Sequence, residues 1–202
     1  MANRGTLFII SAPSGAGKTT LYKMALEGVD HLSPSVSYTT RPKRGTEIEG
    51  VDYCFVSKED FDTMIADNEF IEWAEVHGNK YGTPKKGIHE KLDKGEDILF
   101  DIDVQGARNL KAQFPDAVLI FVLPPSFDIL KERLNSRNTN ETDDINVRMD
   151  NALQEVKAVK DFDYLIINNF LTKALKDLEA IIVAQRAKVN ANSFDFDKFI
   201  SY

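Results

Sequence analysis

Four short runs along the chain are apolar and show no polar–apolar alternation. Such runs are typical of parallel strands whose two faces are both covered by helices. Segments with apolar residues at helical spacing follow each run. The expected strands are residues 7–10, 98–102, 118–123 and 164–167, and the expected helices are residues 19–27, 104–114, 127–134 and 172–189. This alternation predicts a three-layer α/β core around a parallel sheet.

Residues 35–95 follow a different pattern, because their apolar segments are short and often alternate with polar positions. Residues 57–60 (SKED) are similar to a capping box and predict a helix that runs to about Asn68. A second helix is expected over residues 84–94, with Pro84 in its first turn and Gly95 just beyond its end. The expected strands are residues 35–40, 53–56, 70–76 and 80–82. The segment therefore predicts a small mixed α+β insertion.

Two further segments stand outside this scheme. Residues 135–146 are polar and rich in turn-forming residues, as in a solvated loop or a mobile lid. The C-terminal segment carries apolar side chains that either dock on the domain or a partner subunit or belong to a loosely held tail. The expected division is core 1–34, 96–134 and 149–190, insertion 35–95, lid 135–148 and tail 191–202.

Composition narrows the class of protein. The chain has 202 residues and a formal net charge of −7, which argues against non-specific binding to nucleic acid. Its single cysteine, Cys54, cannot form an internal disulfide, as expected in a reducing cytosol. The N-terminal apolar run lacks a signal-peptide cleavage site, and the run at residues 117–123 is too short to cross a bilayer. We expect a soluble cytoplasmic protein without membrane partners, either a monomer or a homodimer.

Residues 9–20 (IISAPSGAGKTT) carry the first chemical motif. The segment resembles the phosphate loop G-x-x-x-x-G-K-[ST], with Ala12 at the place of the first glycine. Gly15 and Gly17 let backbone N–H groups turn toward a polyphosphate, Lys18 reaches its terminal phosphates, and the Thr19 hydroxyl can bind Mg²⁺. A buried strand before the loop and a helix after it predict a nucleotide-binding P-loop protein.

A second phosphate site is expected at residues 39–47 (TTRPKRGTE). Arg41, Lys43 and Arg44 stand out in an acidic chain, and guanidinium groups bind phosphate oxygens bidentately. The alternative is a solvated basic loop. The chain lacks the N-K-x-D segment with which GTPases recognise guanine, and it is short for a motor or transporter ATPase. These features favour a small-molecule kinase.

The sequence resembles the guanylate kinase family, which phosphorylates GMP with ATP. The matching segments run in order from residue 11 to about residue 185 and are SAPSGAGKTT, SYTTRPKRGTE, GVDYCF, FIEWAEVHGNKYGT, ILFDIDVQGA, PPSFDILKERLNSRNT, INVRM and IIN. The resemblance implies Mg²⁺-dependent transfer of the ATP γ-phosphoryl group to GMP, and also to dGMP. It leaves two alternatives: a non-catalytic guanylate-kinase-like module that binds proteins, and a related kinase of another phosphorylated acceptor.

The resemblance also implies roles for individual residues. The expected catalytic residues are Lys18, Arg41, Arg137 and Arg148. The expected ATP site is Ala12, Pro13, Ser14, Gly15, Ala16, Gly17, Lys18, Thr19, Thr20, Arg133, Arg137 and Asn168, with Asn168 at the adenine edge. The expected GMP site is Ser37, Arg41, Arg44, Tyr53, Glu72, Tyr81, Thr83 and Asp103.

The chemistry of guanine agrees with the role given to Glu72. Guanine offers two adjacent donors, N1–H and the exocyclic amine, and one carboxylate can accept from both. Adenine has no donor at N1, so the same carboxylate would reject it. Asp101 and Asp103 end the strand at residues 98–102, where ligands of α/β sheets bind. Asp101 is expected either to pair with Lys18 or to hold, through water, a Mg²⁺ ion that Thr19 also binds. The alternative for both aspartates is that they cap the following helix.

The sequence departs from the family pattern at three positions. Asn138 stands where the family usually has glycine, Asn169 where acidic residues are common, and Lys80 where a tyrosine is common. Each leaves in place the charged groups on which phosphoryl transfer depends.

Overall fold

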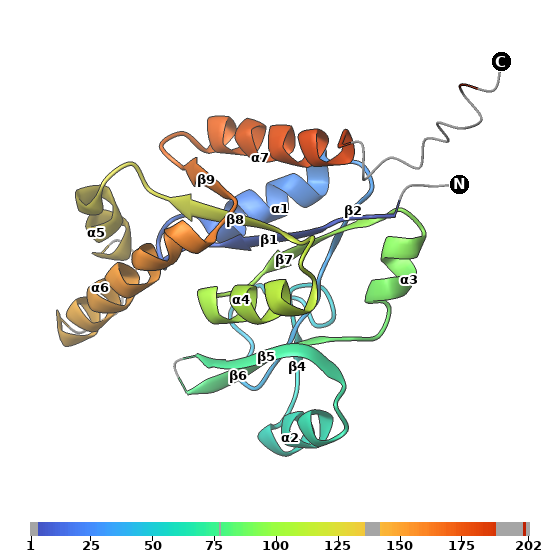
Figure 1. Cartoon of the computed structure of the whole chain (residues 1–202). Helices are drawn as coiled ribbons and strands as arrows, with labels where there is room; N and C mark the ends of the chain where they lie inside the picture. Colours follow the sequence, from blue (N-terminus) through green and yellow to red (C-terminus); the bar gives the residue numbers. More distant parts are fainter. Residues whose placement is uncertain (1–3, 77, 136–141, 189–199, 201–202) are drawn as a thin grey trace.

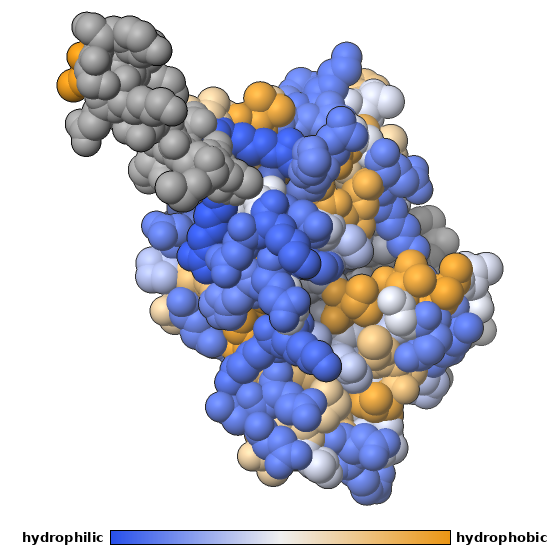
Figure 2. Space-filling view, turned by 90° about the vertical axis from the view of Figure 1, so that its right-hand side faces the viewer, coloured by the Kyte–Doolittle hydropathy of each residue, from blue (hydrophilic) through white to orange (hydrophobic). Residues whose placement is uncertain are grey.

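The computed structural model describes residues 4–76, 78–135, 142–188 and 200, and for residues 142–148 it describes the backbone alone. A parallel sheet lies between two layers of helices, and a smaller sheet lies beyond one of these layers (Figure 1). Figure 2 shows one face of the molecule, on which apolar residues form scattered groups between hydrophilic ones. No helix in the described part of the chain is long and apolar enough to cross a membrane.

The five strands of the main sheet are all parallel and lie in the order β2-β7-β1-β8-β9. The four predicted strands are confirmed, and β2 is a fifth that the pattern did not predict. A three-residue edge strand that ends in Pro34 carries too few positions to show a pattern. The strands are β1 (Leu7–Ser11), β2 (Leu32–Pro34), β7 (Asp97–Asp101), β8 (Val118–Leu123) and β9 (Tyr164–Ile167).

Helices cover both faces of this sheet. On one face α1 (Lys18–Gly28) and α7 (Leu171–Arg186) enclose a core that includes Phe8, Ile120 and Ile166. On the other face α3 (Ile88–Asp93) and α4 (Val104–Gln113) enclose a core around Ile9 and Phe100. The expectation of burial on both faces is wrong for β9, where Leu165 and Ile167 are about half exposed, because β9 is an edge strand.

The insertion forms its own four-stranded sheet in the order β4-β3-β6-β5. Its strands are β3 (Tyr38–Thr39), β4 (Cys54–Phe55), β5 (Phe70–Val76) and β6 (Asn79–Pro84). The Ser57 hydroxyl accepts a hydrogen bond from the Asp60 N–H at the start of α2 (Lys58–Ala66), so the predicted cap is confirmed. The packed rings of Phe61 and Phe70 join α2 to β5.

The helix predicted over residues 84–94 begins later than expected. Pro84 is the last residue of β6 and pairs with Phe70 on β5, and α3 begins only at Ile88 after Gly87. The end of the helix is as predicted. Gly95 has a φ of 82°, its N–H donates to the Leu92 carbonyl, and the Glu96 N–H donates to the Lys91 carbonyl.

The polar segment at residues 135–146 is in part helical, which corrects the expectation of a loop. Helix α5 (Phe127–Asn135) ends where the segment begins, and α6 (Thr142–Lys157) starts within it. Residues 136–141 lie outside the described residues. The two helices share a small apolar cluster of Leu130, Leu134, Met149 and Ala152, separate from the two cores of the main sheet.

Candidate active site

The phosphate loop connects the carboxyl end of β1 to the first turn of α1. Gly15 and Gly17 have φ angles of 87° and 90°, which L residues with side chains rarely adopt. The Ala16 N–H donates to the Pro13 carbonyl at 3.1 Å and closes a turn inside the loop. Ser14, Thr19 and Thr20 are exposed, whereas Pro13, Gly15 and Ala16 are buried. The loop thus presents hydroxyl groups and the N-terminus of α1 on one accessible side, as an anion site requires.

Lys18 lies between this loop and the end of β7. Its Nζ atom is 2.5 Å from Asp101 Oδ1 and donates to the Ile102 carbonyl at 3.0 Å. Both side chains are about one-fifth exposed, so the ion pair is accessible at the edge of the sheet. The register places Asp101 directly opposite Ile10 on the neighbouring strand β1. Asp101 and the Ile102 carbonyl therefore hold the ammonium group next to the loop.

Two other predicted ATP residues lie beside the loop. The Asn168 side chain is buried and its Nδ2 donates to the Ala16 carbonyl at 2.8 Å. Arg133, near the end of α5, donates from Nη2 to the Asn168 carbonyl at 3.2 Å. Arg137 lies outside the described residues, as does Asn138, and Arg148 lies in α6 where the backbone alone is described.

A second cluster of charge surrounds Arg41 in the insertion. Its guanidinium donates to both carboxylate oxygens of Glu47, at 2.7 and 2.5 Å, and its Cζ lies 4.8 Å from the centroid of the Tyr53 ring. The Tyr53 ring packs edge-on against Tyr81, with 6.0 Å between the centroids. Arg44 is exposed and its backbone N–H donates to Glu47 at 2.8 Å. Arg41 and Arg44 thus share one carboxylate, and Tyr53 and Tyr81 pack beside the Arg41 guanidinium.

The three predicted guanine contacts form a buried chain of hydrogen bonds. Thr83 Oγ1 donates to Glu72 Oε1 at 2.7 Å and lies 3.1 Å from Ser37 Oγ. All three side chains are buried, at 7% exposure or less. β5 and β6 pair Glu72 with Thr83, so the contact follows from the register of the hairpin.

The environment of Glu72 opposes ionisation. Burial raises the pKa of the Glu72 carboxyl to about 7, the hydrogen bond from Thr83 lowers it, and the nearby Asp103 raises it. Glu72 also lies close to the first turn of α4, because a Cβ added to Gly106 would be 3.0 Å from Oε2. Asp103 itself caps that helix, since its Oδ1 accepts from the Gly106 N–H at 2.7 Å. Asp103 thus caps α4 and Asp101 pairs with Lys18, and the contact of Asp103 with GMP stays a prediction.

Asp101 and α1 connect the two clusters. Burial, followed by Asp101, raises the pKa of Tyr53 to about 12, so the carboxylate near Lys18 also lies near the tyrosine that packs on Arg41. Lys23 on α1 pairs with Asp52 at 2.5 Å, one residue before Tyr53. Asp101 at the end of β7 thus lies near both Lys18 of the first cluster and Tyr53 of the second.

Sequence reasoning missed three residues of this region. Glu47 is the last residue of the motif at residues 39–47, but the motif does not show that its carboxylate binds Arg41. Tyr22 on α1 is mostly buried near Asp101 and Tyr53, and burial and Asp101 raise its pKa. Glu155 on α6 lies close enough to Lys18 and Asp103 for both to shift its pKa, although burial, the largest cause, raises it. The position of Glu155 could have been inferred only from the helical spacing of residues 142–157, and no helix was predicted there.

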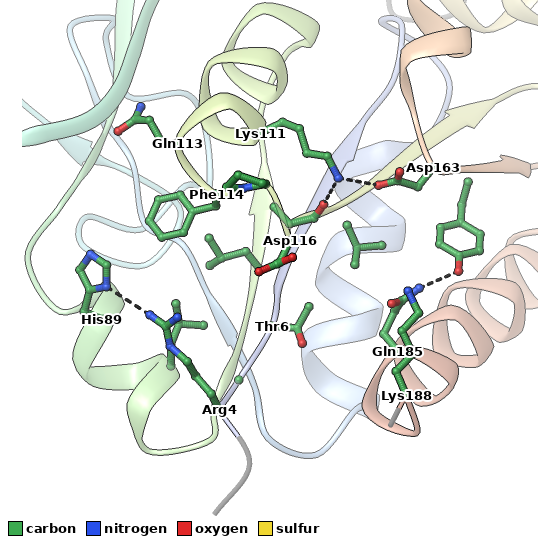
Figure 3. A pocket seen from close by; sticks show the side chains of 17 residues that line it. Arg4, Thr6, His89, Lys111, Gln113, Phe114, Asp116, Asp163, Gln185 and Lys188 are labelled. Carbon is green, nitrogen blue, oxygen red and sulfur yellow. Dashed lines mark hydrogen bonds and ion pairs between the residues drawn. The ribbon is translucent and has the colours of Figure 1, made fainter. Parts of the chain in front are cut away.

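A pocket of about 1100 Å³ lies away from these residues (Figure 3). Its lining includes Leu7, Val118 and Tyr164, the first residues of β1, β8 and β9, so it lies at the amino ends of these strands. Its polar side chains contact one another: Lys111 binds Asp163 and the Ala117 carbonyl, and Arg4 lies within hydrogen-bond distance of His89. None of the predicted site residues lines it.

The residues near the phosphate loop fit a magnesium ion. Thr19 Oγ and the Asp101 carboxylate are hard oxygen donors, which Mg²⁺ prefers, and both lie beside the loop. Within the described residues there is no group of three or more His, Cys, Asp or Glu side chains that could hold a metal. Two oxygen donors beside a phosphate loop suit an ion that takes most of its ligands from nucleotide phosphates and water.

Comparisons with known proteins agree with this geometry. The guanylate kinase family model matches residues 4–185. The guanylate kinase of Syntrophotalea carbinolica is 47% identical over 190 residues, which cover 94% of this chain and 90% of that protein. That of Dechloromonas aromatica is 50% identical over 180 residues, 89% of each. The crystal structure of guanylate kinase from Anaplasma phagocytophilum has a TM-score of 0.84 at 31% identity and covers 99% of this chain and 96% of its own. The chain therefore belongs to the guanylate kinase family.

Proposed function

We propose that this chain transfers the γ-phosphoryl group of ATP to GMP or dGMP and releases ADP with GDP or dGDP. The observation behind this proposal is that one chain combines a phosphate loop, an arginine cluster and a buried carboxylate that accepts a hydrogen bond from Thr83. The first can hold a donor polyphosphate, the second an acceptor phosphate and the third a guanine base. The family to which the chain belongs supports the same reaction.

On the donor side, the loop N–H groups and Lys18 would bind the β- and γ-phosphates of ATP. The Lys18–Asp101 pair supports this role, because it holds the ammonium group beside the loop at 2.5 Å from the carboxylate. Positive charge placed before the reaction stabilises the charge that develops on the transferred phosphoryl group without a cost of reorganisation. Arg137 and Arg148 are proposed to complete this set from the lid.

On the acceptor side, Arg41, Arg44, Tyr53 and Tyr81 would hold the GMP phosphate. The bidentate contact of Arg41 with Glu47 supports this role, because it presents the guanidinium to two oxygens of one anion. An oxygen of the GMP phosphate is already an anionic nucleophile, so the transfer requires orientation of that oxygen and no general base. Ionised Glu72 would accept the guanine N1–H and amine donors, with Ser37 and Thr83 beside it.

Mg²⁺ is the proposed cofactor, with Thr19 and Asp101 on its protein side. When bound with ATP, it would neutralise charge on the phosphates. Closure of the lid, residues 135–148, over the donor would exclude water, which otherwise competes for the phosphoryl group. We also propose a cytoplasmic location, which the single Cys54 favours, and a monomer or homodimer as the working unit.

A coupled assay with Mg-ATP and GMP, dGMP, AMP, UMP or CMP tests the function. We expect turnover with GMP and dGMP and a preference over AMP of about 10⁴-fold, because AMP lacks the two adjacent donors that the buried carboxylate would accept from guanine. Absence of GMP turnover would refute the proposal. Equal use of all acceptors would instead favour a related kinase without base recognition.

Lys18→Ala tests the donor site. The variant removes a positive charge that acts mainly on the transferred phosphoryl group, so we expect kcat to fall by about 10²-fold or more. The dissociation constant of GMP should stay the same. Lys173→Ala is the matched control, because Lys173 is exposed on α7 and pairs with Asp177 four residues later. Unchanged turnover in Lys18→Ala would contradict the role given to Lys18.

A further inference from the structure

Asn168 lies buried beneath the phosphate loop. Its side chain is 5% exposed, and its Nδ2 donates to the Ala16 carbonyl at 2.8 Å, although the two residues are 152 positions apart in the chain. The Ala16 carbonyl is part of the turn that carries the phosphate-facing N–H groups. This contact thus reaches the loop from its protein side rather than from the side where a ligand would bind.

The backbone of Asn168 is fixed by two further elements. Its N–H donates to the Leu123 carbonyl at the end of β8, at 2.7 Å, and its own carbonyl accepts from Arg133 of α5 at 3.2 Å. The residue therefore follows β9 directly and is bound to β8 and to α5. These two hydrogen bonds fix the backbone from which the Asn168 side chain extends to the loop.

Gly17 leaves the space that the Asn168 amide occupies. A Cβ added to Gly17 would lie 2.4 Å from Asn168 Nδ2, closer than two such atoms can approach. Gly17 also has a φ of 90°, so both the conformation and the space require glycine at this position. The absence of a side chain at Gly17 therefore leaves room for the Asn168 amide against the loop.

We infer that Asn168 is a positioning residue that orients the peptide group between Ala16 and Gly17. A trans peptide group is planar, with its C=O and N–H directed to opposite sides. By binding the Ala16 carbonyl, Asn168 directs the Gly17 N–H away from the core, to the side on which the donor phosphates would lie. This inference rests on the proposed function only in naming ATP as the polyphosphate.

Inorganic tripolyphosphate with Mg²⁺ separates this role from a contact with adenine, since it has phosphates and no base. In Asn168→Ala the Ala16 carbonyl loses its partner while buried. We expect the affinities for Mg-tripolyphosphate and for Mg-ATP, measured by calorimetry, to fall by the same factor of about ten. The amide resonance of Gly17 should shift in the free protein, and the affinity for GMP should not change.

Asn168→Asp and Asn169→Asp form a matched pair. Both add one negative charge at neighbouring positions, but Asn169 is exposed and its side chain has no part in the loop contact. We expect Asn168→Asp to weaken Mg-tripolyphosphate more than Asn169→Asp does. If Asn168→Ala does not fold, Asn168→Ser provides the same comparison, because its hydroxyl is too short to reach the Ala16 carbonyl.

A loss of ATP affinity with unchanged tripolyphosphate affinity would overturn the inference in favour of an adenine contact. Unchanged binding of both ligands would overturn it in favour of no role. Because tripolyphosphate binding requires no acceptor, the comparison stays informative even if the chain fails to phosphorylate GMP. Failure of the proposed function and failure of this inference are therefore distinguishable.

Discussion

At the residue scale, Glu72 faces two opposing demands. Recognition of guanine requires an ionised carboxylate that accepts two N–H groups. Burial near Asp103 disfavours that ionised form and raises the pKa to about 7. The hydrogen bond from Thr83 lowers the pKa only in part. In the role proposed for Glu72, a pKa near neutrality would make GMP binding sensitive to pH within the physiological range.

We expect the GMP dissociation constant to rise by about tenfold when the pH falls from 8 to 6. The sign follows from the raised pKa: as pH falls through about 7 the carboxylate is protonated, and the apparent affinity falls with the fraction that stays ionised. Calorimetric titration of the protein with GMP at a series of pH values measures this dependence. The same pH profile in the native chain and in Glu72→Gln would contradict this prediction.

Glu72→Gln provides the control, because any pH dependence that it retains comes from the GMP phosphate, whose second pKa is also near 6. The variant also tests the linkage to folding. A raised carboxyl pKa means that the protonated form favours the folded state, and this contribution is lost as pH rises through about 7. Glu72→Gln should therefore be more resistant to urea than the native chain at pH 8, and the difference should vanish at pH 4.

Local motifs predicted the residue types of the site better than their contacts. Lys18 and Arg41 could be found because phosphate chemistry requires cations at fixed places in short motifs. The contact of Asn168 with Ala16 joins distant parts of the chain and depends on how β8, β9 and α5 meet. The sequence could not distinguish this buried place beneath the loop from a place at the adenine edge. The adenine contact stays a prediction.

At the element scale, the interior strands could be predicted and the boundaries of the insertion could not. β8 agrees with its prediction residue by residue, because burial on both faces requires a continuous apolar run. The predicted start of α3 was wrong because proline is common both in the first turn of a helix and at the end of a strand. β6 includes Pro84 because this residue pairs with Phe70 on β5. Local spacing in the sequence does not reveal this contact.

Gly82 shows how closely β6 packs in the insertion. A Cβ at this position would lie 2.8 Å from Phe70 Cδ1 and 2.9 Å from Phe61 Cζ, and both rings are buried. We expect Gly82→Ala to lower the free energy of unfolding by about 1–3 kcal/mol, because the two rings must move. Displacement of β6, which carries Tyr81 and Thr83, should also raise the KM for GMP severalfold and leave the affinity for ATP unchanged.

Gly28→Ala is the matched control for this substitution. A Cβ at Gly28 would lie 3.6 Å from the flexible Glu179 carboxylate, an ordinary contact, and Gly28 is the last residue of α1. Denaturant unfolding and steady-state kinetics of the two variants should therefore differ. An unchanged KM for GMP in Gly82→Ala would mean that the guanine contacts do not depend on the packing of β6.

At the scale of the whole molecule, the apolar core is divided unevenly. The main sheet has a large buried cluster on each face. The insertion relies on Phe61 and Phe70 and on one strand, β5, whose Ile71 belongs to the cluster beneath α4. Gln113 of α4 also donates from its side chain to the Ile71 carbonyl. The proposed GMP side of the site thus lies on the part with the smaller apolar core, and β5 packs that part against the main core.

This division predicts a gradient of amide hydrogen exchange in the free protein. Exchange should be slowest in β1, β7 and β8, intermediate in β5 and fastest in the two-residue strands β3 and β4, because local opening follows the amount of buried apolar contact. GMP should slow exchange in β3 and β6, since a ligand that binds only the closed form stabilises it by mass action. A non-hydrolysable ATP analogue with Mg²⁺ should instead slow exchange at residues 12–20 and leave β3 unchanged. Exchange in β3 as slow as in β8 before any ligand is added would contradict this account, because it would require the insertion to open only when the main core does.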